Sequence, residues 1–115
     1  MQVQRWNQTE VEQMNGSIGR QVLHGSNITV SRLILKKGGV VPVHHHINEQ
    51  ITTVLEGRLM FLMDGKEVLL EAGESLVIPP NVPHRVDVLE DSIALDVFAP
   101  VREDWIRGDD AYLRK

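Results

Sequence analysis

The residues best suited to chemistry in this chain are histidines, and four of the five lie in two places. Three are consecutive, His44 to His46, and the fourth is His84. Histidine is the commonest ligand of transition metals because its neutral imidazole offers a lone pair near neutral pH. In an extended strand the side chains alternate, so His44 and His46 share one face and His45 points the other way. Taken alone, three consecutive histidines fit a solvated run on an edge strand better than a metal site, and it is the rest of the chain that favours the metal site.

A series of short β-strands must position these residues. Runs rich in Val, Ile and Leu are separated by Gly, Pro, Asn and Asp, a pattern typical of a sandwich or barrel. Asp64-Gly65 predicts a type I′ hairpin turn. Residues 9–12 predict one helical turn with Thr9 as its N-cap, and residues 102–113 are expected to be helical or irregular. We expect strands over 20–24, 27–36, 41–46, 50–56, 58–63, 66–71, 75–79, 84–89 and 92–99.

Composition limits the classes of protein that fit. The 115 residues are enough for one domain, which we divide into an N-terminal segment 1–19, a barrel 20–100 and a C-terminal tail 101–115. The net charge of −4, with mixed signs, argues against a nucleic-acid partner. The absence of cysteine excludes disulfides and thiolate chemistry. Because no signal peptide or membrane-spanning run is visible, we expect a cytoplasmic protein that does not bind membranes.

Two stretches place glycine, histidine and proline at the spacings of two known sequence motifs. Residues 38–57 follow G-x5-H-x-H-x3-E-x6-G, and residues 73–88 follow G-x5-P-x-G-x2-H-x3-N, with three departures. Gln50 stands in place of glutamate, Asn81 in place of a turn glycine, and Val88 in place of asparagine. Asn81 can take the place of the glycine because asparagine tolerates positive φ. The chain therefore resembles a small single-domain cupin. This resemblance implies an all-β fold, a double-stranded β-helix or jelly-roll-like antiparallel barrel.

Gln50 decides what kind of metal site to expect. It shares the face of His46 if Ile47-Asn48 adds no bulge, whereas Glu49 falls on the other face. Parity and motif spacing favour Gln50 as a ligand, and the alternative is that Glu49 binds directly. An amide beside neutral imidazoles leaves the charge of a divalent ion uncompensated, which favours a Lewis-acid role. The donor types do not choose among Ni, Zn, Fe, Mn, Co and Cu.

The last predicted strand places a carboxylate beside an aromatic ring. Asp96 and Phe98 share one face of this strand, and Arg102 follows just beyond Pro100. If this face lines the barrel, burial raises the pKa of Asp96 and suits it to proton transfer. Arg102 can then bind a carboxylate in a bidentate manner at the barrel mouth. The equally weighted alternative is an Asp–Arg ion pair that pins the C-terminal tail.

Together, His-x-His-x3-Gln, the later histidine and Asp-x-Phe-x3-Arg are similar to the KdgF-type cupins of pectin and alginate breakdown. The resemblance implies a metal-dependent enzyme with isomerase- or lyase-type chemistry, which converts 4,5-unsaturated monouronates into linear 5-keto forms. Its substrate is therefore a small carboxylated sugar. The implied metal ligands are His44, His46, Gln50 and His84, and the implied active-site residues are Asp96, Phe98 and Arg102.

Other functions of small cupins remain open from the sequence. A cupin dioxygenase would need a redox metal and more often carries the glutamate that Gln50 replaces. A sugar-binding cupin would bind without turnover, and a degenerate cupin would have lost its metal. The resemblance also implies a homodimer formed by sheet packing and exchange of N-terminal strands, with which the apolar residues Ile93, Leu95 and Val97 are compatible.

Overall fold

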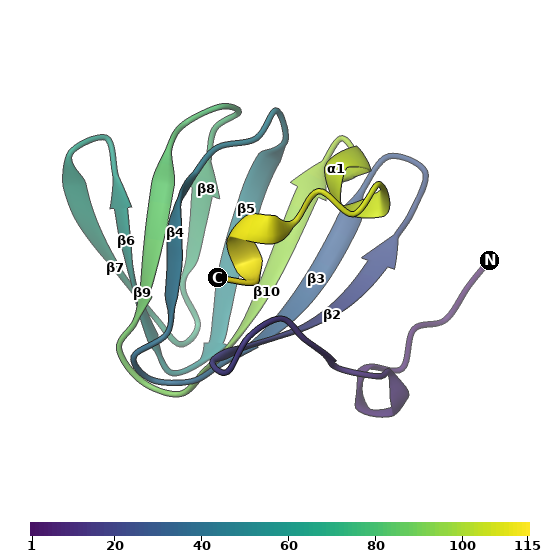
Figure 1. The fold of residues 1–115 in the computed structure, drawn as a ribbon, viewed down its shortest axis with the longest axis horizontal. Coiled ribbons are helices and arrows are strands. Elements are labelled where there is room, and N and C mark those ends of the chain that lie inside the picture. The colour runs from purple at the N-terminus through teal and green to yellow at the C-terminus, as the bar shows by residue number, and fades with distance from the viewer.

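The computed structural model describes all 115 residues, and it confirms the all-β fold. Ten strands form two antiparallel sheets that face each other (Figure 1). The order is β1-β2-β3-β10-β5-β8 in the larger sheet and β4-β9-β6-β7 in the smaller one. The strands are β1 (Glu12–Gln13), β2 (Ile18–His24), β3 (Thr29–Leu35), β4 (Val40–His44), β5 (Glu49–Glu56), β6 (Arg58–Met63), β7 (Lys66–Glu71), β8 (Ser75–Ile78), β9 (His84–Val88) and β10 (Ser92–Ala99).

The core lies between the two sheets because alternate residues of each strand point inward. In β10, Ala94, Asp96 and Phe98 are buried, whereas Leu95 and Val97 on the outer face are half-buried. The apolar part of this core comes from both sheets. Each fully buried Leu or Phe in such a core contributes about 1.5–3 kcal/mol relative to an exposed one. Asp96 is a carboxyl group inside this core, and its register partners Ser31 and Thr52 are buried polar residues.

Turns place the strands where the sequence predicts them. Asp64 and Gly65 have φ values of 54° and 70°, as a type I′ turn requires, which confirms the hairpin between β6 and β7. Asn81 has φ of 63°, so it adopts the conformation for which the motif uses glycine. Gly57 has φ of 89°, and a Cβ there would overlap the backbone of Asp91 and Ser92. The tight connection from β5 to β6 therefore requires glycine.

Two local predictions are wrong. The predicted helical turn at residues 9–12 is absent. A 3-10 turn, η1 (Trp6–Gln8), lies just before these residues instead. Thr9 follows η1, and its hydroxyl donates to the Arg5 carbonyl oxygen, while the next residues extend because β1 pairs with β2. The predicted strand 41–46 is also too long, since β4 ends at His44.

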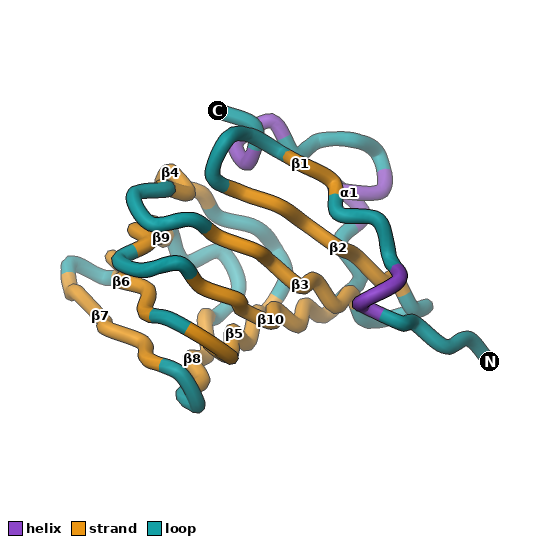
Figure 2. Tube along the Cα trace, turned by 90° about the horizontal axis from the view of Figure 1, so that it is seen from below, coloured by secondary structure: helices purple, strands orange, loops and turns teal.

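The C-terminal residues return to the open side of the barrel. In Figure 1, α1 (Glu103–Ile106) lies beside the end of β10, on the side of β3, and a second 3-10 turn, η2 (Ala111–Leu113), lies between β4 and β10. Trp105 and Leu113 are buried in the core, and Asp110 pairs with Arg20 of β2 at 2.8 Å. The tail is therefore held firmly against the barrel. The N-terminus, by contrast, projects from the body (Figure 2).

No helix in the structure has the length and apolar character that a membrane crossing requires.

Candidate metal centre

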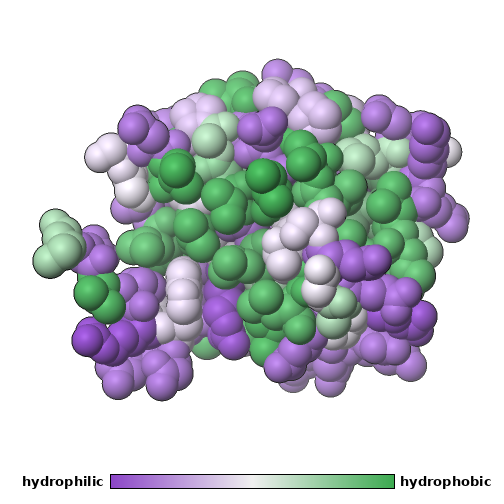
Figure 3. Space-filling view, turned by 180° about the vertical axis from the view of Figure 1, so that it is seen from behind, coloured by the Kyte–Doolittle hydropathy of each residue, from purple (hydrophilic) through white to green (hydrophobic).

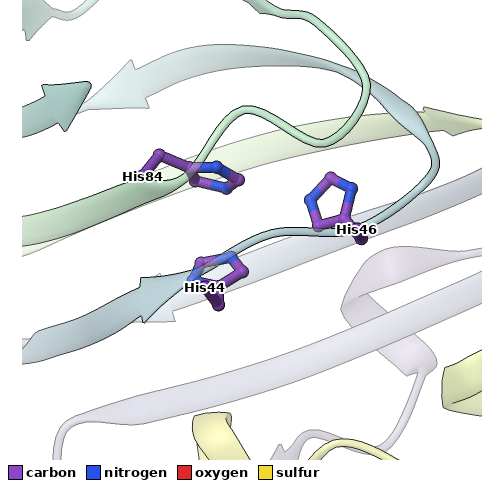
Figure 4. Close-up of side chains that lie close together, drawn as sticks. All are labelled: His44, His46 and His84. Atoms are coloured by element: carbon purple, nitrogen blue, oxygen red, sulfur yellow. The ribbon is translucent and has the colours of Figure 1, made fainter. Parts of the chain in front are cut away.

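Three of the predicted ligands meet at one end of the barrel. His44 is the last residue of β4 and His84 is the first residue of β9, and the two are register partners in adjacent strands. His46 lies in the connection between β4 and β5, from which its ring turns back toward the other two (Figure 4). One ligand nitrogen from each ring lies within 4.8 Å of the others. His45 is exposed, as the alternation of side chains predicts.

Main-chain carbonyl groups hold the three imidazoles in the tautomer that metal binding needs. The Nδ1 atom of each ring lies 2.8–3.0 Å from the carbonyl oxygen of a residue two positions away. A carbonyl only accepts, so each Nδ1 carries the proton and each Nε2 keeps its lone pair. The Nε2 atom of His84 is buried and has no hydrogen-bond partner. A metal ion is the partner that fits such an orphaned lone pair.

The protonation states of these rings also suit a metal. Burial, followed by repulsion from His84, lowers the pKa of His44 to about 3. Burial, followed by the positive charge of Arg102, lowers the pKa of His46 to about 4. Burial likewise lowers the pKa of His84. All three rings are therefore neutral at pH 7, and a cation does not have to displace protons to bind them.

Gln50 approaches the histidines from the opposite sheet. It is the second residue of β5 and is buried, with its Oε1 atom 3.0 Å from the Nε2 atom of His46. Because His46 carries its proton on Nδ1, two acceptors face each other across this distance. A divalent cation would satisfy both. Glu49 is exposed, so the geometry supports Gln50 rather than Glu49 as the fourth donor.

Asp96 lies beside this centre, inside the barrel. Thr52 donates a hydrogen bond of 2.6 Å to its Oδ1 atom. Burial raises the pKa of Asp96 to about 6, although the Thr52 hydrogen bond and the charge of Arg102 act in the opposite direction. A carboxyl group with this pKa can both accept and return a proton near neutral pH.

Arg102 holds a carboxylate, but this carboxylate belongs to the tail. Its Nε and Nη2 atoms donate to the two oxygens of Asp104 at 2.9 and 2.7 Å, and Nη2 also donates to the Tyr112 hydroxyl at 3.0 Å. The guanidinium lies 4.6 Å from the Phe98 ring centroid and 4.2 Å from that of Trp105. The predicted ion pair between Asp96 and Arg102 is therefore absent, and Arg102 pairs within the tail, with Asp104. The Nη1 atom of Arg102 makes no hydrogen bond to the protein.

Most of these groups border one small cavity. Its volume is about 40 Å³, room for about three water molecules. The predicted residues His44, Gln50, His84, Asp96, Phe98 and Arg102 line it, and His46 contacts two of them, Gln50 and Phe98. Tyr112 also lines the cavity and stacks on His44, with ring centroids 4.4 Å apart.

Comparison with known proteins identifies the family of the chain. Residues 31–98, more than half of the chain, match the Cupin_2 family, a cupin domain. The chain belongs to the cupin family. This cupin is 28% identical over 102 residues to the pectin degradation protein KdgF of Dickeya dadantii, which covers 86% of the chain and 93% of that protein.

Solved structures and a further relative extend the comparison. The cupin is similar to KdgF from Halomonas sp., at TM-score 0.82 and 25% identity, covering 88% of this chain and 96% of that one. It is also similar to an RmlC-like cupin from Shewanella frigidimarina, at TM-score 0.83 and 33% identity over 89% and 93% of the two chains. The match to the uncharacterized protein MJ1618 of Methanocaldococcus jannaschii, 30% identical over 79 residues, spans 64% of this cupin and 63% of that protein. The chain is therefore a cupin that resembles the KdgF type.

Two residues of the site escape the sequence patterns. Thr52 follows Gln50 by two residues in the same strand, so the alternation of side chains alone predicts that Thr52 points inward. Threonine is common in strands, however, and nothing marks this one as part of the site. Tyr112 lies in the irregular tail and reaches His44 only through the folded arrangement of the chain, for which the sequence carries no local signal.

Proposed function

We propose that this cupin catalyses the metal-dependent conversion of 4,5-unsaturated monouronates, released from pectin or alginate, into linear 5-keto sugars. The observation that carries this proposal is the set of groups around one cavity: four neutral donors, a buried carboxyl group with a raised pKa, and an arginine. The similarity to KdgF proteins supports the choice of substrate.

The charge of the site favours an anionic substrate. Three neutral imidazoles and one amide bring no charge to balance that of a divalent cation. The charge of Arg102 is already paired by Asp104, and ionised Asp96 supplies one negative charge, so the site with its cation would keep a net charge of about one positive unit. When bound by these donors, the metal would supply Lewis acidity toward substrate oxygens. The donor set of His44, His46, Gln50 and His84 does not identify this metal. The carboxylate of a uronate would complete the local charge balance, with Nη1 of Arg102 as a free donor toward it.

The reaction that we propose is an isomerisation, so every atom of the substrate remains in the product. The bond from C1 to the ring oxygen breaks, the anomeric hydroxyl loses its proton to give an aldehyde, and the ring oxygen becomes an enol hydroxyl on C5. The enol then loses its O–H proton while C4 gains one, which leaves a ketone at C5. Asp96 would accept a hydroxyl proton and deliver it to C4. Phe98, which packs against His46 and Arg102, would shape the apolar wall and exclude water.

The size of the cavity sets a condition on substrate entry. About 40 Å³ does not hold a six-carbon sugar acid. Tyr112 covers His44, and its hydroxyl receives hydrogen bonds from Arg102 and Trp105. Binding of a uronate in this cavity would therefore require side chains that line it to move, and Tyr112, which comes from the tail, is one of them.

The proposal is tested by running the reaction in D₂O with freshly generated unsaturated monouronate and following the products by NMR. We expect the metal-loaded protein to accelerate formation of the 5-keto sugar, with one deuterium at C4 in a single configuration. The spontaneous reaction should give both configurations. Oxygen uptake with an iron-loaded sample would instead indicate a dioxygenase, and saturable binding of the sugar without turnover would indicate a sugar-binding cupin. Either result would overturn the proposal.

We further propose that the cupin forms a homodimer through the outer face of its larger sheet. Figure 3 shows apolar side chains gathered on the back of the molecule. A second copy fits this face because a two-fold axis brings the same largely apolar surface to both sides. Arg32, the register partner of Leu95, is the charged residue at the centre of this face, and its guanidinium donates to the Gln21 side chain. The exposed or half-buried aliphatic residues of the face are Val30, Ile34, Ile51, Leu55, Val77, Ile93, Leu95 and Val97.

Sedimentation equilibrium tests this dimer. We expect twice the monomer mass for the parent protein and monomer mass for Leu95→Glu, which places a charge on the central strand β10. A parent protein that stays monomeric over a wide range of concentration would contradict the proposal. Exchange of residues 1–19 between the two copies stays a prediction.

A further inference from the structure

Thr52 connects the metal centre to Asp96, and the proposed reaction does not yet use it. Its side chain is 1% exposed. The hydroxyl accepts a hydrogen bond of 2.8 Å from Nε2 of Gln50 and donates one of 2.6 Å to Oδ1 of Asp96. We propose that Thr52 is a positioning residue, which turns the amide oxygen of Gln50 toward the histidines and holds the Asp96 carboxylate beside them. This inference rests on the proposed function of the same site.

The direction of the hydrogen bonds gives Thr52 this role. A hydroxyl group has one proton, and here Asp96 receives it, so the hydroxyl oxygen must accept from its other neighbour. The NH₂ end of the Gln50 amide is therefore the end that faces Thr52. The oxygen end then faces the Nε2 atom of His46, at 3.0 Å.

If Thr52 had no hydroxyl group, the opposite orientation of the Gln50 amide would become favourable. Rotation by half a turn would point the NH₂ group of Gln50 at the unprotonated Nε2 atom of His46, which would accept a hydrogen bond from it. That orientation satisfies both groups in the metal-free protein, but an amide NH₂ cannot bind a cation. Thr52 therefore excludes an arrangement that competes with the metal.

Strand register explains why the three side chains form a continuous row. Thr52 and Asp96 are direct register partners on β5 and β10, and Gln50 precedes Thr52 by two residues on the same inward face. Ser31 is the register partner of Asp96 on its other side, in β3, and its buried hydroxyl has no hydrogen-bond partner. The neighbouring Thr53 points outward and pairs with Ser75 at the surface. The chain thus offers two hydroxyl residues as matched controls.

The test measures Co²⁺ binding without substrate, using the visible absorption spectrum of the bound ion and competition with a chelator. We expect Thr52→Val, which keeps the shape of the side chain, to weaken Co²⁺ affinity about tenfold or more and to change the spectrum. Thr52→Ser keeps the hydroxyl and should restore both. Thr53→Val and Ser31→Ala should bind Co²⁺ as the parent does. Thermal unfolding of each metal-free variant checks that the fold is intact.

Two results would overturn the role of Thr52. One is a Thr52→Val protein that binds Co²⁺ with the affinity and spectrum of the parent; if this variant does not fold, Thr52→Ala carries the same test. The other is a loss of affinity in Thr52→Ser as large as in Thr52→Val, which would assign the effect to packing rather than to the hydroxyl. If the parent binds Co²⁺ normally but does not turn over uronates, the proposed function fails and the role of Thr52 stands.

Discussion

Replacing Asp96 by Asn separates proton transfer from metal binding. The substitution changes one atom, and the remaining oxygen of Asn can still accept the hydrogen bond that Thr52 donates to Oδ1. The position of the side chain and the four metal donors should therefore be preserved. Loss of a positioned general acid or base lowers turnover by about 10²–10⁴-fold, which corresponds to about 2.7–5.5 kcal/mol in the activation free energy. We expect a decrease in kcat within this range.

The pKa of Asp96 adds a second part to this prediction. In the metal-free protein this pKa is about 6, and a bound cation would lower it, so the carboxyl group is ionised at pH 7 and can accept the first proton. Once the pH falls below this lowered pKa the group is protonated, and kcat/KM of the parent should fall by about tenfold per pH unit. The acid limb should be absent from Asp96→Asn.

The assay follows the ultraviolet absorbance of the conjugated double bond across a pH series, with the metal content of each sample measured beforehand. Asp109→Asn serves as a control because Asp109 is exposed and pairs only with Arg107. An Asp96→Asn protein that retains its metal and turns over at the parental rate would refute the role of Asp96. The same conclusion would follow if the acid limb persisted in the variant.

Three further predictions concern stability and substrate binding. Gly57→Ala and Gly38→Ala both place alanine at φ of 89°, but only a Cβ at Gly57 meets backbone atoms. In urea unfolding, Gly57→Ala should therefore lower the free energy of unfolding by about 1–3 kcal/mol more than Gly38→Ala does. Equal losses in the two variants would contradict this. In the metal-free protein the site histidines have lowered pKa values, so the unfolded chain binds more protons below the ordinary imidazole pKa of 6.5. The raised pKa of Asp96 has the opposite effect on stability, but it is one group against three histidines. The free energy of unfolding should therefore be at its full value above about pH 6.5 and lower at about pH 5. A higher urea midpoint at the lower pH would contradict this. Arg102→Lys keeps the positive charge but loses the forked geometry of the guanidinium and its stacking on aromatic rings. In steady-state kinetics, KM should therefore rise about tenfold, with a smaller change in kcat. An unchanged KM would exclude substrate binding by Arg102.

The sequence predicts most of the fold because β-structure has a strong local signal. Inward and outward side chains alternate along strands such as β10, and Asp64-Gly65 marks a hairpin through the backbone conformation that it requires. The N-terminal prediction failed for a non-local reason. Thr9 is a plausible cap, but pairing of β1 with β2 determines how residues 12–13 run, and this pairing is not visible near Thr9.

The site was predicted less completely than the fold, because parts of it depend on loops and on the tail. Parity placed His44 and His46 on one side, and they do converge, but His46 reaches the centre from a connection rather than from a strand. Gln50 lies on β5, in the sheet opposite His44 and His84. Residue spacing along one strand does not predict that two sheets bring these residues together. The contact of Tyr112 with His44 depends on how the tail folds back over the barrel.

The most direct measurement is the rate at which the absorbance of a 4,5-unsaturated monouronate decays with three forms of the protein: metal-loaded parent, chelator-stripped parent and metal-treated His46→Ala. His45→Ala is the matched control, because His45 is the exposed neighbour of His46. We predict that the loaded parent and His45→Ala accelerate the decay above the spontaneous rate, whereas the stripped parent and His46→Ala do not. A fully metal-loaded parent that leaves the spontaneous rate unchanged, or a His46→Ala protein that is as active as the parent, would contradict the proposed metal-dependent reaction.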